Sequence, residues 1–134
     1  MISEMYQEQI LDHYRHPRNY GSLPSPDATF EDSNPLCGDL VAMDLAFEGE
    51  RIADIRFRGS GCAISQAAAS MLTELAAGMT REEARAITRE TVLEEVGVPL
   101  SPARVKCALL GHKVLLAALY GVPAHEAEGK DPHS

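Results

Sequence analysis

The chain has 134 residues, of which 45% are apolar, a composition that suits one compact domain over residues 1–134. Its 12 Lys and Arg residues against 20 Asp and Glu residues give a formal net charge of −8, which disfavours binding to nucleic acid or to anionic membranes. No stretch approaches the roughly 20 apolar residues of a membrane span, and the charged N-terminus does not resemble a signal peptide. We therefore expect a cytoplasmic protein whose partner is another protein or a small ion.

The N-terminal segment predicts an amphipathic helix over residues 2–15, because its apolar residues recur at helical spacing and a proline at position 17 ends the pattern. The stripe that contains Met5, Tyr6 and Ile10 has two interpretations, core packing and a docking face for a partner, and we favour packing. A connector rich in Gly and Pro follows, and then a short edge strand over residues 29–33.

The middle of the chain predicts a β-hairpin. Residues 40–48 and 51–58 alternate in polarity, the second run more cleanly, and Gly49 with Glu50 forms the turn between them. A Gly-Ser-Gly hinge then leads into a predicted helix over residues 62–77. Its residues are mostly small, which favours close packing of this helix against the sheet.

Two short polar helices come next. Thr80 and Glu83 have the spacing of a capping box, which begins a helix that ends near residue 87. A second helix is predicted over residues 89–96. Their polarity indicates that both helices are exposed.

The last predicted helix is the longest, over residues 102–120. Ser101 supplies its N-cap, a proline occupies its first position, and Gly121 ends it. The polar tail over residues 124–134 is expected to fray.

The three cysteines lie beside the ends of these segments, which is not where core packing alone would place them. Their odd number argues against a disulfide framework. Cys62 opens a helix, so the helix dipole should lower its pKa and favour the thiolate. Gly38 allows a turn that can bring the side chains of Cys37 and Asp39 to one centre. With the thiolates of Cys62 and Cys107, this would give three thiolates and a carboxylate, which complete a tetrahedral metal site. The spacing matches no local zinc-finger pattern, so buried structural thiols remain the alternative.

Other side chains near the cysteines are expected to have ordinary roles. Arg104 and Lys106 flank Cys107 but are expected to be solvated. The histidines His13, His16 and His112 are expected to be ordinary polar residues, not ligands. A hydrolase with Cys37 as its nucleophile would need a paired histidine and an oxyanion hole, and the sequence locates neither.

Four blocks together carry a resemblance to a known family. They are LDHYRHPRNYG (residues 11–21), NPLCGD (34–39), GSGCAISQAAAS (59–70) and PARVKCALLGHK (102–113). With these blocks in this order, the chain resembles the IscU/SufU/NifU-N-terminal family of iron–sulfur cluster assembly proteins. The resemblance implies an α+β, SufE/NifU-like fold, in which helices cover one face of a three-stranded antiparallel sheet. It also implies that Cys37, Asp39, Cys62 and Cys107 form one site that holds zinc or a transient iron–sulfur cluster.

One position bears on the branch of the family. Members of the IscU branch carry a histidine directly before the third cysteine, where this chain has Lys106, so the chain looks more similar to SufU. That branch implies tight zinc binding and persulfide transfer from a cysteine desulfurase to Cys37, with apo iron–sulfur proteins downstream. The insertion usual in SufU proteins between the second and third cysteines is absent. A non-catalytic scaffold and a zinc-dependent sulfurtransferase therefore both remain possible, as does a zinc-stapled interaction module without sulfur transfer, and the oligomeric state is open.

Overall fold

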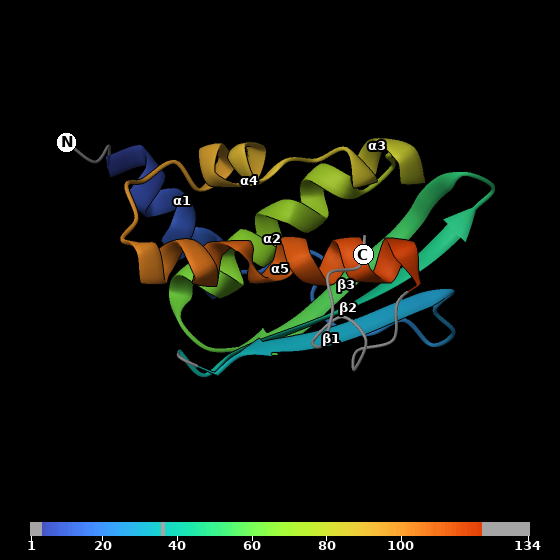
Figure 1. Cartoon of the computed structure of the whole chain (residues 1–134), viewed down its shortest axis with the longest axis horizontal. Helices are drawn as coiled ribbons and strands as arrows, with labels where there is room; N and C mark the ends of the chain where they lie inside the picture. The colour runs from blue at the N-terminus through green and yellow to red at the C-terminus, as the bar shows by residue number, and fades with distance from the viewer. Residues whose placement is uncertain (1–3, 36, 122–134) are drawn as a thin grey trace.

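The computed structural model describes residues 4–35 and 37–121. One layer is an antiparallel sheet, and helices form the other (Figure 1). The strands are β1 (Ala28–Asn34), β2 (Asp39–Glu48) and β3 (Arg51–Ser60); the helices are α1 (Glu4–Arg15), α2 (Ala63–Ala76), α3 (Arg81–Arg85), α4 (Arg89–Val96) and α5 (Pro102–Tyr120). The predicted α+β fold with helices on one face of a three-stranded antiparallel sheet is confirmed.

The register of the sheet brings three chain segments to one of its ends. The strand order is β1-β2-β3, and Asn34 pairs with Asp39 where β1 turns into β2. Leu40, the next residue of β2, pairs with Ser60 at the end of β3. The loop that holds Cys37 and the start of α2 therefore lie at the same end of the sheet.

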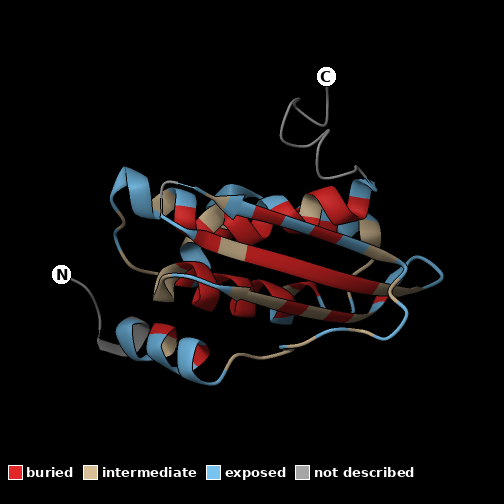
Figure 2. Cartoon of the chain, turned by 90° about the horizontal axis from the view of Figure 1, so that it is seen from below, coloured by how far each residue is buried: buried red, intermediate tan, exposed pale blue. Residues whose placement is uncertain are grey.

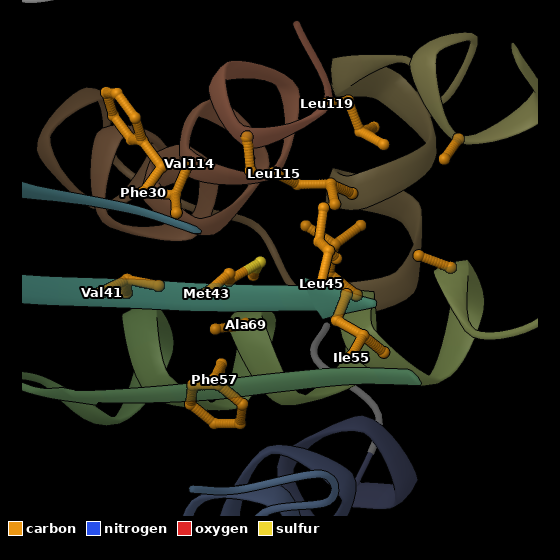
Figure 3. Packing of buried hydrophobic residues seen from close by; sticks show 14 of the residues in the cluster. Phe30, Val41, Met43, Leu45, Ile55, Phe57, Ala69, Val114, Leu115 and Leu119 are labelled. Atoms are coloured by element: carbon orange, nitrogen blue, oxygen red, sulfur yellow. The ribbon is translucent and has the colours of Figure 1, made fainter. Parts of the chain in front are cut away.

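Helices α2 and α5 pack directly on the sheet. Helix α2 contacts β2 and β3, and α5 contacts β1 and β2. The side chains of Val41, Met43 and Leu45 point from β2 into this layer, where Figure 3 shows them facing α2 and α5. Burying each such side chain contributes about 1.5–3 kcal/mol to stability. The small residues of α2 allow the close approach that the sequence predicted.

The short helices α3 and α4 are less exposed than the sequence suggested. Ala84 of α3 and Val92 and Val96 of α4 are buried, and α4 packs against both α2 and α5. The prediction of exposed helices was therefore wrong for one side of each. Both are too short for their few apolar residues to produce a clear periodic signal.

The local signals mark the element boundaries well. Thr80 and Glu83 form the predicted capping box, Cys62 is the N-cap of α2, and Ser101 caps α5. Gly121 takes the left-handed conformation at the end of α5. The tail over residues 124–134 lies outside the described residues.

Helix α1 is held against α2 by buried contacts. Ile10 is buried in a cluster with Met71 and Ala108, which supports core packing for this part of the stripe; the side chains of Met5 and Tyr6 lie outside what the structure describes. Nδ1 of His13 lies 2.7 Å from Oγ of Ser70 on α2. Figure 2 shows the resulting contrast, with α1 buried along one side and exposed along the other.

The connector between α1 and β1 is fixed to the sheet by the buried carboxylate of Asp44. One oxygen of Asp44 accepts from the backbone N–H of Leu23, and the other accepts from the hydroxyl of Thr29. Arg58 forms an ion pair with the same carboxylate at 3.1 Å.

Within the described residues, no helix combines the length and apolar character that crossing a membrane requires.

Candidate metal centre

A tight turn between β1 and β2 presents Cys37 and Asp39. The backbone N–H groups of Cys37 and Gly38 both donate to the carbonyl of Asn34, at 3.2 and 2.8 Å. Gly38 has φ +70°, a left-handed conformation that glycine adopts without strain. The turn leaves Cys37 exposed and Asp39 fully buried.

Cys62 reaches the same place from the N-terminus of α2, just after the end of β3. Its backbone N–H donates to Oδ1 of Asp39 at 2.8 Å, and its Sγ lies 3.9 Å from Oδ2. As the N-cap of α2, its sulfur also accepts from the backbone N–H of Ser65 at 3.5 Å. The expected position of this thiol at a helix N-terminus is confirmed.

Cys107 completes the group from α5. It is fully buried, and its Sγ lies 3.2 Å from Sγ of Cys37, although 70 residues separate the two in sequence. One ligand atom each from Cys37, Asp39 and Cys107 lies within 4.8 Å of the others. Cys62 lies outside this three-residue group and joins it through Asp39. The structure thus brings all four predicted residues to one place.

The separations suit a small tetrahedral cation. With metal–sulfur bonds of about 2.3 Å, neighbouring sulfur ligands of a tetrahedral site lie about 3.8 Å apart. The sulfurs of Cys37 and Cys107 lie 3.2 Å apart, which is shorter than this separation. The Cys62 sulfur lies 3.9 Å from Oδ2 of Asp39, somewhat longer than the roughly 3.5 Å of a tetrahedral sulfur–oxygen pair. Thiolates with one carboxylate form a donor set that zinc accepts. The residues present therefore fit zinc.

The environment of Cys107 opposes charge when no cation is bound. Burial is the largest cause that raises the pKa of this thiol, and its contacts with Asp39 and Cys37 add to the effect. A bound cation reverses this balance, because it stabilises the thiolate directly. Binding of a metal must therefore displace the proton of Cys107.

Two residues support the centre in ways that the sequence did not predict: Gly61, expected only to form part of a hinge, and Gln66, which had no predicted role. Gly61 has φ +132°, and a Cβ built on it would lie 2.2 Å from Oδ1 of Asp39. The buried amide of Gln66 donates to the carbonyls of Ser60 and Leu40, which joins the ends of β3 and β2 to α2. The presence of a glutamine among the small residues of α2 was the feature of the sequence that could have indicated a role for Gln66.

The remaining candidates lie apart from the centre. His112 is buried and its Nε2 lies 2.9 Å from the carbonyl of Ile87, whereas His13 contacts Ser70. His16 is exposed, and so are Arg104 and Lys106. Neither buried histidine is therefore placed to act as a base for Cys37.

Comparison with known proteins identifies the family. The family model described as the NifU-like N terminal domain matches residues 5–128. The chain belongs to this family. A curated relative, the zinc-dependent sulfurtransferase SufU of Bacillus subtilis, is 33% identical over 131 residues, covering 85% of this chain and 88% of SufU. The iron–sulfur cluster assembly scaffold protein IscU 1 of Archaeoglobus fulgidus is 39% identical over 115 residues, covering 86% of this chain and 74% of that protein.

Solved structures agree with the family assignment. The crystal structure of FiSufU from Fervidobacterium islandicum AW-1 superposes with a TM-score of 0.73 at 31% identity, covering 87% of this chain and 98% of FiSufU. The N-terminal NifU-like protein of Brucella abortus, at 23% identity and a TM-score of 0.71, shares the fold. This NifU-like chain therefore belongs among the iron–sulfur cluster assembly proteins.

Proposed function

We propose that the protein acts in the cytoplasm and accepts persulfide sulfur from a cysteine desulfurase on Cys37. Its metal centre consists of Cys37, Asp39, Cys62 and Cys107. The observation that carries this proposal is the 3.2 Å contact between the sulfur of Cys37, an exposed residue, and the sulfur of Cys107, a buried one. Such a pair offers one thiol to a partner while Cys107 and Asp39 stay buried.

Zinc, when bound, would hold these cysteines as thiolates at neutral pH. Cys62 is the N-cap of α2 and Cys107 lies within α5, so these two thiols form the fixed part of the site. Cys37 comes from the turn, and Gly38 beside it allows that turn to change conformation. Cys37 is therefore the thiol best placed to leave the site and react.

The transfer step exchanges one sulfur–sulfur bond for another. The thiolate of Cys37 attacks the outer sulfur of the desulfurase persulfide, and a new bond forms between that sulfur and Cys37. The bond inside the donor persulfide breaks, and the desulfurase cysteine leaves as a thiolate. The number of sulfur–sulfur bonds is unchanged, so the step needs no oxidant or reductant.

Asp39 sets how readily the site opens. Its carboxylate is the hard member of an otherwise soft donor set, so it is the ligand that exchanges most easily. Oδ1 is already engaged by the backbone N–H of Cys62, which leaves Oδ2 to face the sulfurs. The same centre could hold a nascent iron–sulfur cluster as cargo for an apo-protein.

The test is a metal analysis combined with labelled sulfur transfer under anaerobic, reducing conditions. Wild type, Cys37→Ala and Asp39→Ala are incubated with the desulfurase and radiolabelled cysteine. One tightly held zinc per chain and label on Cys37 would indicate a sulfur carrier. An iron–sulfur chromophore that passes to an apo-protein, most stable in Asp39→Ala, would indicate a scaffold. Labelling of Cys37→Ala at the wild-type rate would overturn the role of Cys37. Zinc that resists exchange, with no sulfur transfer to the wild type, would indicate a zinc-stapled interaction module.

A further inference from the structure

A groove of about 580 Å³ begins beside the metal centre and follows α5. Asn34 and Pro35 line it at the end of β1, directly before the turn that holds Cys37. Along α5 its wall includes Val105, Leu109 and Leu116, all of which are only partly buried. From residue 105 to residue 116, helical geometry gives this apolar wall a length of about 17 Å.

The charges along the groove have the sign opposite to that of the whole chain. Arg89, Lys106 and Lys113 line it, and no acidic residue does among the described residues, although the chain carries a net charge of −8. Lys113 is paired with Asp32 at 2.7 Å. Arg89 and Lys106 are exposed and form no ion pair with any residue in the described ranges. Two cations thus flank an apolar surface without a countercharge.

We propose that this groove receives a segment of the desulfurase in which apolar side chains are flanked by carboxylates. The proposal rests on the proposed function, because it assumes that sulfur arrives from a protein donor. Apolar side chains of the segment would cover Leu109 and Leu116, and its carboxylates would pair with Arg89 and Lys106.

The position of the groove favours the sulfur donor as its occupant. Cys37 is the exposed thiol of the centre, whereas Cys107 is buried. A donor must bring its persulfide to Cys37, and the groove begins at Pro35, two residues before it. A segment bound there would hold the donor next to the reacting thiol.

Charge reversal tests the electrostatic half of the proposal. The double variant Arg89→Glu/Lys106→Glu should bind the purified desulfurase at least about tenfold more weakly, with a weaker dependence on salt. A glutamate at position 89 begins α4 and suits its dipole, so folding should be preserved. The matched control is Arg104→Glu, an exposed change on α5 outside the groove, which should have little effect. If each reversed charge weakened desulfurase binding by the same factor in the double variant and in Arg104→Glu, the proposal would be overturned.

Photo-crosslinking from position 116 identifies the occupant. The full chain with benzoylphenylalanine in place of Leu116 is irradiated with the desulfurase, and the joined peptides are sequenced. A desulfurase segment with apolar and acidic residues is the expected product. Crosslinks only to residues 122–134 of the same chain, or only to a second copy, would overturn the proposal.

A small-molecule donor separates this proposal from the proposed function. Glutathione persulfide needs no docking groove, so the double variant and wild type should load sulfur on Cys37 from it at equal rates. Equal loading with normal desulfurase binding in the double variant would reject only the groove. Failure of wild type to load from either donor would reject the proposed function itself.

Discussion

The backbone N–H of Cys62 donates to Oδ1 of Asp39 at 2.8 Å, a bond that joins the first residue of β2 to the N-cap of α2. It fixes the orientation of a carboxylate that is fully buried. The bond leaves Oδ2 directed toward the cysteine sulfurs, with Cys62 Sγ at 3.9 Å. Part of the proposed metal centre is therefore organised by the protein before any cation binds.

Replacing Asp39 should separate its structural role from its role as a ligand. Asp39→Ala leaves the N–H of Cys62 without its acceptor and should cost about 1–3 kcal/mol of unfolding free energy in metal-free protein. Asp39→Asn keeps an acceptor and should cost less, while both variants lose the carboxylate ligand. Urea unfolding after chelation measures this difference. Equal stability of the two variants would show that the bond contributes little.

Gly61→Ala should damage the centre directly. The new Cβ would lie 2.2 Å from Oδ1 and 2.8 Å from Cα of Asp39, so the carboxylate must move. Gly78→Ala is the matched control, because Gly78 also has a positive φ but has no atom within 4 Å of the added Cβ.

Both glycine variants should lose about 1–3 kcal/mol of stability from backbone strain, but only Gly61→Ala should lose zinc affinity as well. Zinc competition with a chromophoric chelator gives the affinities. Equal zinc affinity in the two variants would contradict the close packing of Gly61 on Asp39.

The three thiols should differ in reactivity in metal-free protein. Cys37 is exposed and should be alkylated first by iodoacetamide, whereas the buried Cys107, whose pKa is raised by burial, should react far more slowly. Mass spectrometry of timed samples at pH 8 gives the order of labelling. Unfolding in urea is the control and should make the rates similar. Early labelling of Cys107 in folded protein would contradict its burial.

Stability should fall when the pH drops below neutrality. Burial lowers the pKa of both His13 and His112 from their ordinary value of 6.5. Between pH 6.5 and the lowered pKa values of the folded state, the unfolded chain therefore binds more protons than the folded one. A fall in pH across this range lowers the free energy of unfolding. The stabilisation is complete above pH 6.5 and is lost as the pH falls through the folded-state pKa values.

Urea unfolding of chelator-treated protein at pH 7.5, 6.5 and 5.5 measures this loss, at most about 1.4 kcal/mol per pH unit for each histidine. His112→Gln removes one titrating group and should flatten the dependence. An unchanged slope in that variant would exclude His112 as a source.

The sequence by itself determined the elements whose signals are local. The Thr80 capping box, the Ser101 cap with proline behind it, and the glycine turn of the hairpin each depend on neighbours within a few residues. Exposure of the short helices was misjudged, because burial of Val92 and Val96 depends on α2 and α5 packing beside them. The prediction that Cys37, Asp39, Cys62 and Cys107 lie together came from the turn at Gly38 and from the four-block resemblance, and no spacing rule supplied it.

Only the tertiary structure decided how the site is built. Cys37 and Cys107 meet because β1 and β2 pair in one register and α5 crosses both strands. The contact of Gly61 with Asp39 and the cationic groove along α5 likewise join residues from separate segments. Hydrophobic periodicity specifies which face of an element is buried, but not which distant element covers it. That choice is made by packing of the whole core, and the distances within the metal centre follow from it.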